Sequence, residues 1–154
     1  MLSQALPAAS PAAAPDMPDA FIDATGAVAG EHALVLGAGG LETMCALLRR
    51  GCASAIELRL GEKPDAGSAD LVLVPALASI EQARAALAQA RRALTRSGRI
   101  VLRGAFGVGD AQTLAIARLL RREGFCALRV QEIGGAAVLS AERPLFARPA
   151  MARA

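Results

Sequence analysis

The sequence predicts an α/β fold built on a mainly parallel sheet that ends in an antiparallel pair of strands. Short apolar runs alternate along the chain with segments whose apolar residues recur at helical spacing, which is typical of such folds. Gly134-Gly135 separates the last two apolar runs, and two glycines between strands indicate a hairpin. With 154 residues, 54% of them apolar, the chain is long enough for one domain with a buried core.

Six segments are predicted to be strands. The first and third contain four consecutive apolar residues each, as expected for parallel strands that are buried on both faces. The last two flank Gly134-Gly135, and we expect them to pair antiparallel, with the final strand running against the fourth. The predicted strands are residues 33–36, 55–60, 71–74, 99–103, 125–133 and 136–141.

Three helices are predicted from apolar spacing and from residues typical of helix ends. The first lies between the first two strands and ends at Gly51. The second begins at Ser79, and Gln82 three residues later completes a capping box. The third begins at Asp110, a favourable N-cap, and ends at Gly124. Right-handed crossovers then place helices on both faces of the sheet.

Both ends of the chain are predicted to lie outside the domain, which we expect to span residues 31–145. Residues 1–30 are rich in Ala and Pro and are predicted to form a disordered tail, because they cannot bury enough apolar surface to offset their ordering entropy. Phe21 and Ile22 are the side chains of this tail that can anchor a short turn on the domain. A second short tail is predicted for residues 146–154.

Composition argues against several classes of protein. The net charge is only +3 and aromatic residues make up 3%, so nucleic acid is not an expected partner. No apolar run approaches the roughly 18 residues that a membrane span needs. The first residues lack the basic region of a signal peptide, so we expect a cytoplasmic protein.

The cysteines and the single histidine do not form a metal site or a disulfide framework. The sequence has no C-x-x-C pair, so we expect reduced thiols and no bound metal. Cys45 and Cys126 fall on apolar stripes and are predicted to lie in the core, whereas Cys52 is predicted to be partly exposed. His32 precedes the first strand, at the end opposite the turn that follows it, and is a poor candidate for a general base.

A glycine-rich turn follows the first strand and is the best candidate for a ligand site. Gly37 and Gly39 allow a tight turn and a close backbone approach to a ligand, and the next helix offers free N–H groups at its start. Glu57 lies twenty residues after Gly37, near the end of the second strand, where a carboxylate can accept hydrogen bonds from two ribose hydroxyls. This spacing favours a nucleotide or nucleoside site. The alternative is a tight turn that binds nothing, with Glu57 a solvated residue beside Arg59.

Several segments, in order, resemble class I methyltransferases that use S-adenosylmethionine (SAM). The resemblance covers about residues 32–145 and implies a three-layer Rossmann-like sandwich of about six strands, with SAM as the cofactor. It also implies that Gly37, Ala38 and Gly39 approach the amino-acid part of SAM and that Glu57 holds its ribose. The segments are Val35-Leu36-Gly37-Ala38-Gly39, residues 64–73, residues 93–102, residues 119–125, Gly134-Gly135 and Ala141-Glu142-Arg143-Pro144.

The chain also departs from the family pattern. Val35 stands where the family has an acidic residue. Only one predicted strand, 55–60, lies where the family has two strands, so a segment that helps to cover the adenine is missing. Residues 75–79 lack the histidine or acid that many family members place there, and we therefore name no catalytic residue.

Three functions remain open from the sequence. The first is SAM binding with methyl transfer to an unidentified small-molecule or protein acceptor. The second is a catalytically degenerate module with the same fold, kept for binding or as a scaffold, which Val35 and the missing segment favour. The third is an NAD(P)-binding domain, which the glycine turn and Glu57 permit but the terminal hairpin argues against.

Overall fold

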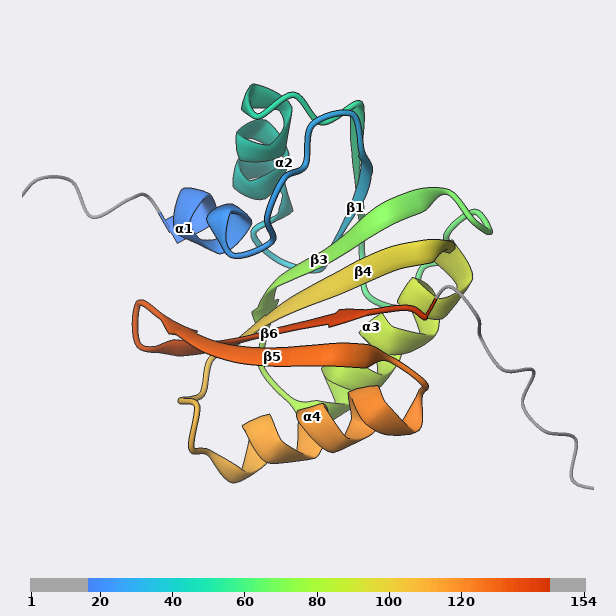
Figure 1. The fold of residues 1–154 in the computed structure, drawn as a ribbon. Coiled ribbons are helices and arrows are strands. Elements are labelled where there is room, and N and C mark those ends of the chain that lie inside the picture. The colour runs from blue at the N-terminus through green and yellow to red at the C-terminus, as the bar shows by residue number, and fades with distance from the viewer. Residues whose placement is uncertain (1–16, 145–154) are drawn as a thin grey trace, which may run out of the picture.

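The computed structural model describes residues 17–144, which form one six-stranded sheet with helices on both faces. The strand order is β2-β1-β3-β4-β6-β5; β1 to β4 are parallel, and β6 runs antiparallel to both β4 and β5 (Figure 1). The predicted fold class and terminal hairpin are therefore confirmed. In chain order the elements are α1 (Met17–Asp23), β1 (His32–Leu36), α2 (Gly40–Arg49), β2 (Ser54–Leu58), β3 (Ala69–Leu77), α3 (Ile80–Ala93), β4 (Leu94–Gly104), α4 (Ala111–Arg122), β5 (Cys126–Ile133) and β6 (Ala136–Glu142).

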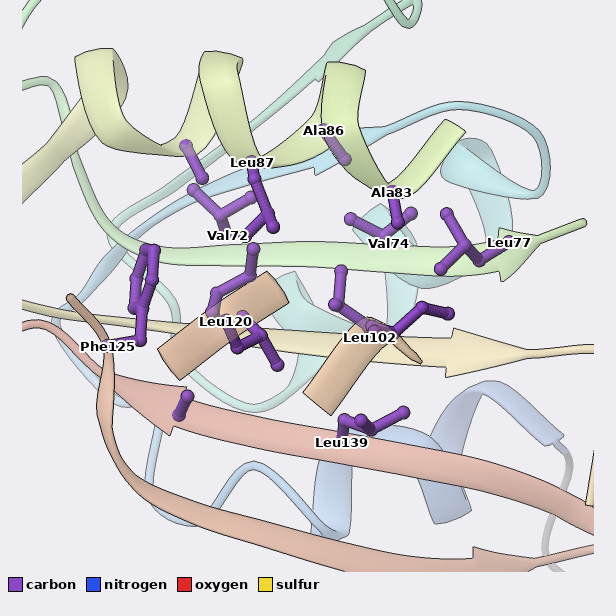
Figure 2. Packing of buried hydrophobic residues seen from close by; sticks show 14 of the residues in the cluster. Val72, Val74, Leu77, Ala83, Ala86, Leu87, Leu102, Leu120, Phe125 and Leu139 are labelled. Atoms are coloured by element: carbon purple, nitrogen blue, oxygen red, sulfur yellow. The ribbon is translucent and has the colours of Figure 1, made fainter. Parts of the chain in front are cut away.

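The sheet separates two hydrophobic cores. Successive side chains of a strand point to opposite faces, so Val72 and Val74 pack toward α3 and α4 while Leu71 and Leu73 pack toward α1 and α2. Figure 2 shows the first of these cores, in which the two helices lay Ala and Leu side chains onto β3, β4 and β6. The result is a three-layer sandwich, with α1 and α2 on one face and α3 and α4 on the other (Figure 1).

Two of the helices begin with the side-chain caps that the sequence predicts. The Ser79 hydroxyl accepts a hydrogen bond from the Gln82 amide at 3.2 Å, and the Asp110 carboxylate accepts one from the Gln112 amide at 2.8 Å. Each bond satisfies one of the amides that the first turn of a helix leaves without an intrahelical partner. These caps fix the starts of α3 and α4.

The predicted boundary of the N-terminal tail is wrong for residues 17–30. Helix α1 lies within them, and Phe21 and Ile22 are 1% and 0% exposed, so these two side chains do anchor the segment on the sheet. Arg50 at the end of α2 bonds Asp23 and Asp19 of α1 and holds the two helices together. Burying two large apolar side chains offsets the ordering entropy that Ala and Pro alone cannot. The rest of the predicted tails, residues 1–16 and 146–154, lie outside the described residues.

The predicted exposure of the cysteines is also wrong. Cys45 and Cys126 are exposed and Cys52 is buried. Cys45 lies on the outer side of α2, and Cys126 lies on β5, which is an edge strand. The Cys52 thiol donates a hydrogen bond to the Glu31 carbonyl oxygen at 2.8 Å, and burial raises its pKa. A buried thiol with a raised pKa is a core side chain without the thiolate character of a nucleophile.

Candidate functional site

The glycine turn between β1 and α2 adopts a conformation that favours glycine at two positions. Gly37 and Gly39 have φ angles of +84° and +80°, in the left-handed region that side chains rarely adopt. Ala38 between them is exposed. The Gly37 amide donates to the Leu58 carbonyl oxygen at 3.0 Å, which ties the turn to the end of β2. The turn therefore presents bare backbone at the carboxyl edge of the sheet.

Helix α2 starts in this turn without a side-chain cap. Its N-cap is Gly39, which has no side chain to accept a hydrogen bond, in contrast to the capped starts of α3 and α4. The first amides of any helix lack intrahelical partners and lie at the positive end of its dipole. At α2 those amides remain available to a polar or anionic group of a ligand.

Glu57 lies directly beside the start of α2. It is paired with Val35 in the parallel register of β1 and β2, and its side chain is exposed. A Cβ on Gly40 would lie 2.5 Å from the Glu57 carboxyl carbon, so a side chain at position 40 would displace this carboxylate from its place beside the helix start. Glu57 and the glycine turn thus lie side by side at the same edge of the sheet. The role of Gly40 was missed, although its place in the run of glycines was the available signal.

A cleft of about 120 Å³ continues this site toward β3 and β4, on the face that carries α1 and α2. Gly39 forms one side, and Pro75 and Ala76, at the end of β3, form another. The segment of residues 75–79, which lacks the histidine or acid of many family members, therefore does reach the site. The lining residues are Phe21, Gly39, Glu42, Thr43, Pro75, Ala76 and Arg103.

Arg103 is the residue of this cleft that sequence reasoning missed. It is half-buried near the end of β4, and one terminal nitrogen donates to the Pro75 carbonyl oxygen at 3.3 Å. Its Nε is buried and finds no hydrogen-bond partner among the residues that the structure describes. The ion pairs among residues 17–144 join other arginines to carboxylates and leave Arg103 out. No local signal marks Arg103 in a chain that has many arginines.

Other polar groups lie away from this site. His32 starts β1, at the opposite end of the strand, where its Nδ1 lies 2.7 Å from the Ser54 hydroxyl oxygen. A larger cavity of about 390 Å³ is lined by residues 23–26, at the end of α1 and just after it, and by residues of β4, β5 and β6. Among these are Arg99 and Glu142, which pair near the middle of β4. In the part of the chain that the structure describes, no three His, Cys, Asp or Glu side chains gather into a metal site. None of the described helices is long and apolar enough to cross a membrane.

The outer edge of the sheet next to the site is open. A single strand, β2, lies between α2 and β3, as the sequence predicts, and it is the edge strand. Ile56 on β2 is 55% exposed, and Leu41 and Leu48 on α2 are also exposed. A nucleoside bound at Glu57 would therefore have one side of its base open to solvent.

No protein-family model matches the sequence, and no curated protein sequence matches it. Solved structures do match the fold. A SAM-dependent methyltransferase from Aquifex aeolicus superposes with a TM-score of 0.67 at 13% identity, over 82% of this chain and 89% of that one. The 1,6-didemethyltoxoflavin-N1-methyltransferase of Burkholderia thailandensis, solved with S-adenosylhomocysteine bound, superposes at 0.65 with 16% identity, over 86% of this chain and 79% of that one.

A third match is the ribosomal protein L11 methylase of Lactobacillus delbrueckii subsp. bulgaricus, at a TM-score of 0.65 and 13% identity, over 83% of this chain and 77% of that one. The names of these proteins give acceptors as different as a small heterocycle and a ribosomal protein, so the shared fold does not specify an acceptor. What the matches share is the architecture described above: the chain has the fold of the class I SAM-dependent methyltransferases.

Proposed function

We propose that this protein binds SAM at the carboxyl edge of its sheet and that methyl transfer is its class of reaction. The observation that carries the proposal is the Glu57 carboxylate beside the glycine turn and the uncapped start of α2. Bare backbone next to a carboxylate at the end of the neighbouring strand suits a ribose and the chain attached to it. The fold is that of proteins named for their use of SAM, which supports the same choice of cofactor.

The residues present fit one side of SAM. Gly37, Ala38 and Gly39 would pass close to the amino-acid part, and Glu57 would accept hydrogen bonds from the ribose hydroxyls. The cleft beside Gly39 is smaller than the roughly 300 Å³ of a pocket that encloses a whole ligand. The adenine would therefore lie outside it, toward the open edge of the sheet that β2 forms. We expect weak binding, because this edge lacks the cover that a further strand would give.

When bound, SAM supplies an electrophilic methyl group, and the protein supplies orientation. The turn and Glu57 would fix the nucleoside, while Phe21 and Pro75 give the cleft apolar walls. Thr43 is occupied, because its hydroxyl donates to the Gly39 carbonyl oxygen at 3.1 Å. Orientation of two reactants can by itself supply a large rate enhancement, so methyl transfer does not require a base among these residues.

Calorimetric titration with SAM, S-adenosylhomocysteine and NAD tests the proposal. We expect heat with the first two and none with NAD. Glu57→Ala should weaken binding of S-adenosylhomocysteine about 10- to 150-fold, the equivalent of about 1.5–3 kcal/mol for hydrogen bonds to a charged group. Gly39→Val should weaken it further, because its side chain would stand at a φ of +80° in the path of the ligand.

Glu132→Ala is the matched control, since Glu132 is an exposed strand carboxylate on β5 at the far edge of the sheet. It should bind like the wild type. If millimolar SAM gives neither heat nor a thermal shift, the cofactor proposal fails and a degenerate binding module stands in its place. A response to NAD alone would favour a dinucleotide-binding domain. Equal binding by wild type and Glu57→Ala would show that the cofactor site has been wrongly assigned.

A further inference from the structure

Among residues 17–144, no carboxylate pairs with the arginine in the cleft beside the glycine turn. Within the same residues Arg103 makes one hydrogen bond, to a main-chain carbonyl oxygen, and its Nε is buried without a partner. A guanidinium has five N–H donors in a planar fork that matches a carboxylate. Leaving buried donors unused costs free energy. A ligand in the cleft that accepts hydrogen bonds from Arg103 would recover this cost.

The same cleft also contains a negatively charged side chain, that of Glu42. Glu42, in the first turn of α2, lines it together with Arg103, and the two are not within ion-pair distance of each other. A simple carboxylic acid would bind Arg103 but would be repelled by Glu42. An α-amino-acid group carries a carboxylate and an ammonium on one carbon, and it can satisfy both residues at once.

The size of the cleft agrees with a group of this kind. Its volume of about 120 Å³ is well below the roughly 300 Å³ of a pocket that encloses a whole ligand. That space accommodates the polar end of a ligand and not a nucleoside. The apolar atoms of Phe21 and Pro75 in the same walls suit the short alkyl chain that follows the amino acid's α-carbon.

Residue 35 offers no competing partner for the ammonium. Val35 is fully buried in the core between the sheet and α2, so it contributes no charge to the site. Glu42, seven residues further along, is the carboxylate that the chain places in the cleft. The ionic contacts of this cleft therefore come from the start of α2 and from β4, and not from the end of β1.

From these observations we propose that Arg103 binds the carboxylate of an α-amino-acid group and that Glu42 binds its ammonium. The proposal rests on the proposed function, because the amino-acid end of SAM is one source of this group. A free amino acid that acts as the methyl acceptor is the other source, and the chemistry of recognition is the same.

The test compares two ligands by calorimetry: S-adenosylhomocysteine and 5′-methylthioadenosine, which keeps the nucleoside and the thioether but has no amino acid. For the wild type we expect S-adenosylhomocysteine to bind at least about 10-fold more tightly, as charged hydrogen bonds require. Arg103→Met should weaken S-adenosylhomocysteine about 10- to 150-fold and leave methylthioadenosine unchanged. Glu42→Gln should weaken S-adenosylhomocysteine by less, because Glu42 is exposed and solvent screens its charge.

A second arm tests the acceptor. A mixture of the twenty amino acids is added to protein saturated with methylthioadenosine and, separately, with S-adenosylhomocysteine, and the thermal shift is measured. A shift in the wild type that Arg103→Met abolishes, seen with S-adenosylhomocysteine already bound, assigns the cleft to a free amino acid. An effect of Arg103→Met confined to the binding of S-adenosylhomocysteine assigns it to the cofactor.

Arg129→Met is the control, because Arg129 is an exposed arginine on the same sheet that lies outside the cleft. Arg103→Lys keeps the charge without the planar fork and should fall between wild type and Arg103→Met. Circular dichroism checks that each variant is folded. If Arg103→Met does not fold, Glu42→Gln tests the cleft independently. Unchanged affinities for both ligands and no change in the amino-acid arm would overturn the inference. If the wild type binds neither nucleoside, it is the proposed function that fails.

Discussion

The two faces of the sheet are built differently, although the same strands supply both. On one face, α3 and α4 have 14 and 12 residues, and the core beneath them contains 23 buried side chains. On the other, α1 and α2 have 7 and 10 residues above a core of 12. That second face also has the cavity of about 390 Å³ over β4, β5 and β6. Buried side chains are thus concentrated on the α3–α4 face, where a hollow of about 130 Å³ lies between the two helices, and the site cleft and the larger cavity lie on the α1–α2 face.

The helix starts differ in the same way. Ser79 and Asp110 cap the helices of the well-packed face with their side chains, whereas α2 starts at Gly39 with none. An uncapped start forgoes stabilisation but leaves amides free at the edge where ligands bind in open α/β sheets. We infer that one face stabilises the fold and the other holds the site. Sites of this kind are commonly drawn from the less stable parts of a molecule.

The largest expected effect that tests this comparison is the loss of a buried leucine from each face. Leu120 of α4 and Leu47 of α2 are both 0% exposed and both helical, so their helix propensities cancel in the comparison. Leu120→Ala should cost about 4 kcal/mol in the free energy of unfolding, near the top of the range for such cavities. Leu47→Ala should cost about 2 kcal/mol, because the smaller core beside it can relax further.

Urea denaturation of the two variants measures both values. Leu120→Val serves as the control, since it removes less volume and should cost less than Leu120→Ala. Equal losses for the two leucines, or a larger loss for Leu47→Ala, would break the comparison between the faces.

The next effect concerns Arg99, which joins the middle of β4 to the segment before β1. Arg99 donates two hydrogen bonds to the Glu31 carboxylate at 2.8 Å and further bonds to the Thr25 and Ala27 carbonyl oxygens. Arg99→Met should destabilise the protein by about 1–3 kcal/mol, since charge-assisted bonds to partly buried groups are lost. Thermal unfolding should show this as a lower Tm.

The matched variant is Arg129→Met, at an exposed position on the same face. Surface substitutions of this type change stability within about 0.5 kcal/mol. If Arg129→Met lowers the stability as much as Arg99→Met does, the hydrogen bonds from Arg99 to the segment before β1 do not stabilise the protein.

The smallest effect distinguishes the helix starts. Ser79→Ala should cost about 1 kcal/mol, because the Gln82 amide loses its acceptor. Gly39→Ser introduces a residue that caps helices well, yet it should not stabilise α2, because Gly39 has a φ of +80° that a side chain opposes. Chemical denaturation of both variants tests this, and a gain in stability for Gly39→Ser would show that α2 is simply under-capped.

Much of the fold was predictable because local chemistry sets it. Four apolar residues in a row predict the buried strands β1 and β3, and the glycine pair predicts the hairpin between β5 and β6. The caps at Ser79 and Asp110 follow from side-chain chemistry within one helical turn. The spacing between Gly37 and Glu57 predicted their proximity, because parallel neighbours bring their carboxyl ends to the same edge.

The features that were missed depend on contacts between distant segments. Helix α1 packs on the domain because α2 and the sheet meet Phe21 and Ile22. The sequence marks these two side chains as possible anchors but does not show what they pack against. The exposure of Cys45 and Cys126 depends on which helix side and which strand edge remain uncovered. Predicting either would have required the packing of the whole domain.

The sequence by itself determined the alternation of strands and helices, the terminal hairpin and the glycine turn with its carboxylate, because periodicity, turn chemistry and parallel pairing act over short distances or fixed spacings. Only the tertiary structure decided which arginine faces the site. Arg103 reaches the cleft because β4 lies beside β3 and its side chain points to the face of α1 and α2. An arginine has the same local pattern whether it meets a carboxylate, water or a ligand, and only the surrounding fold determines which.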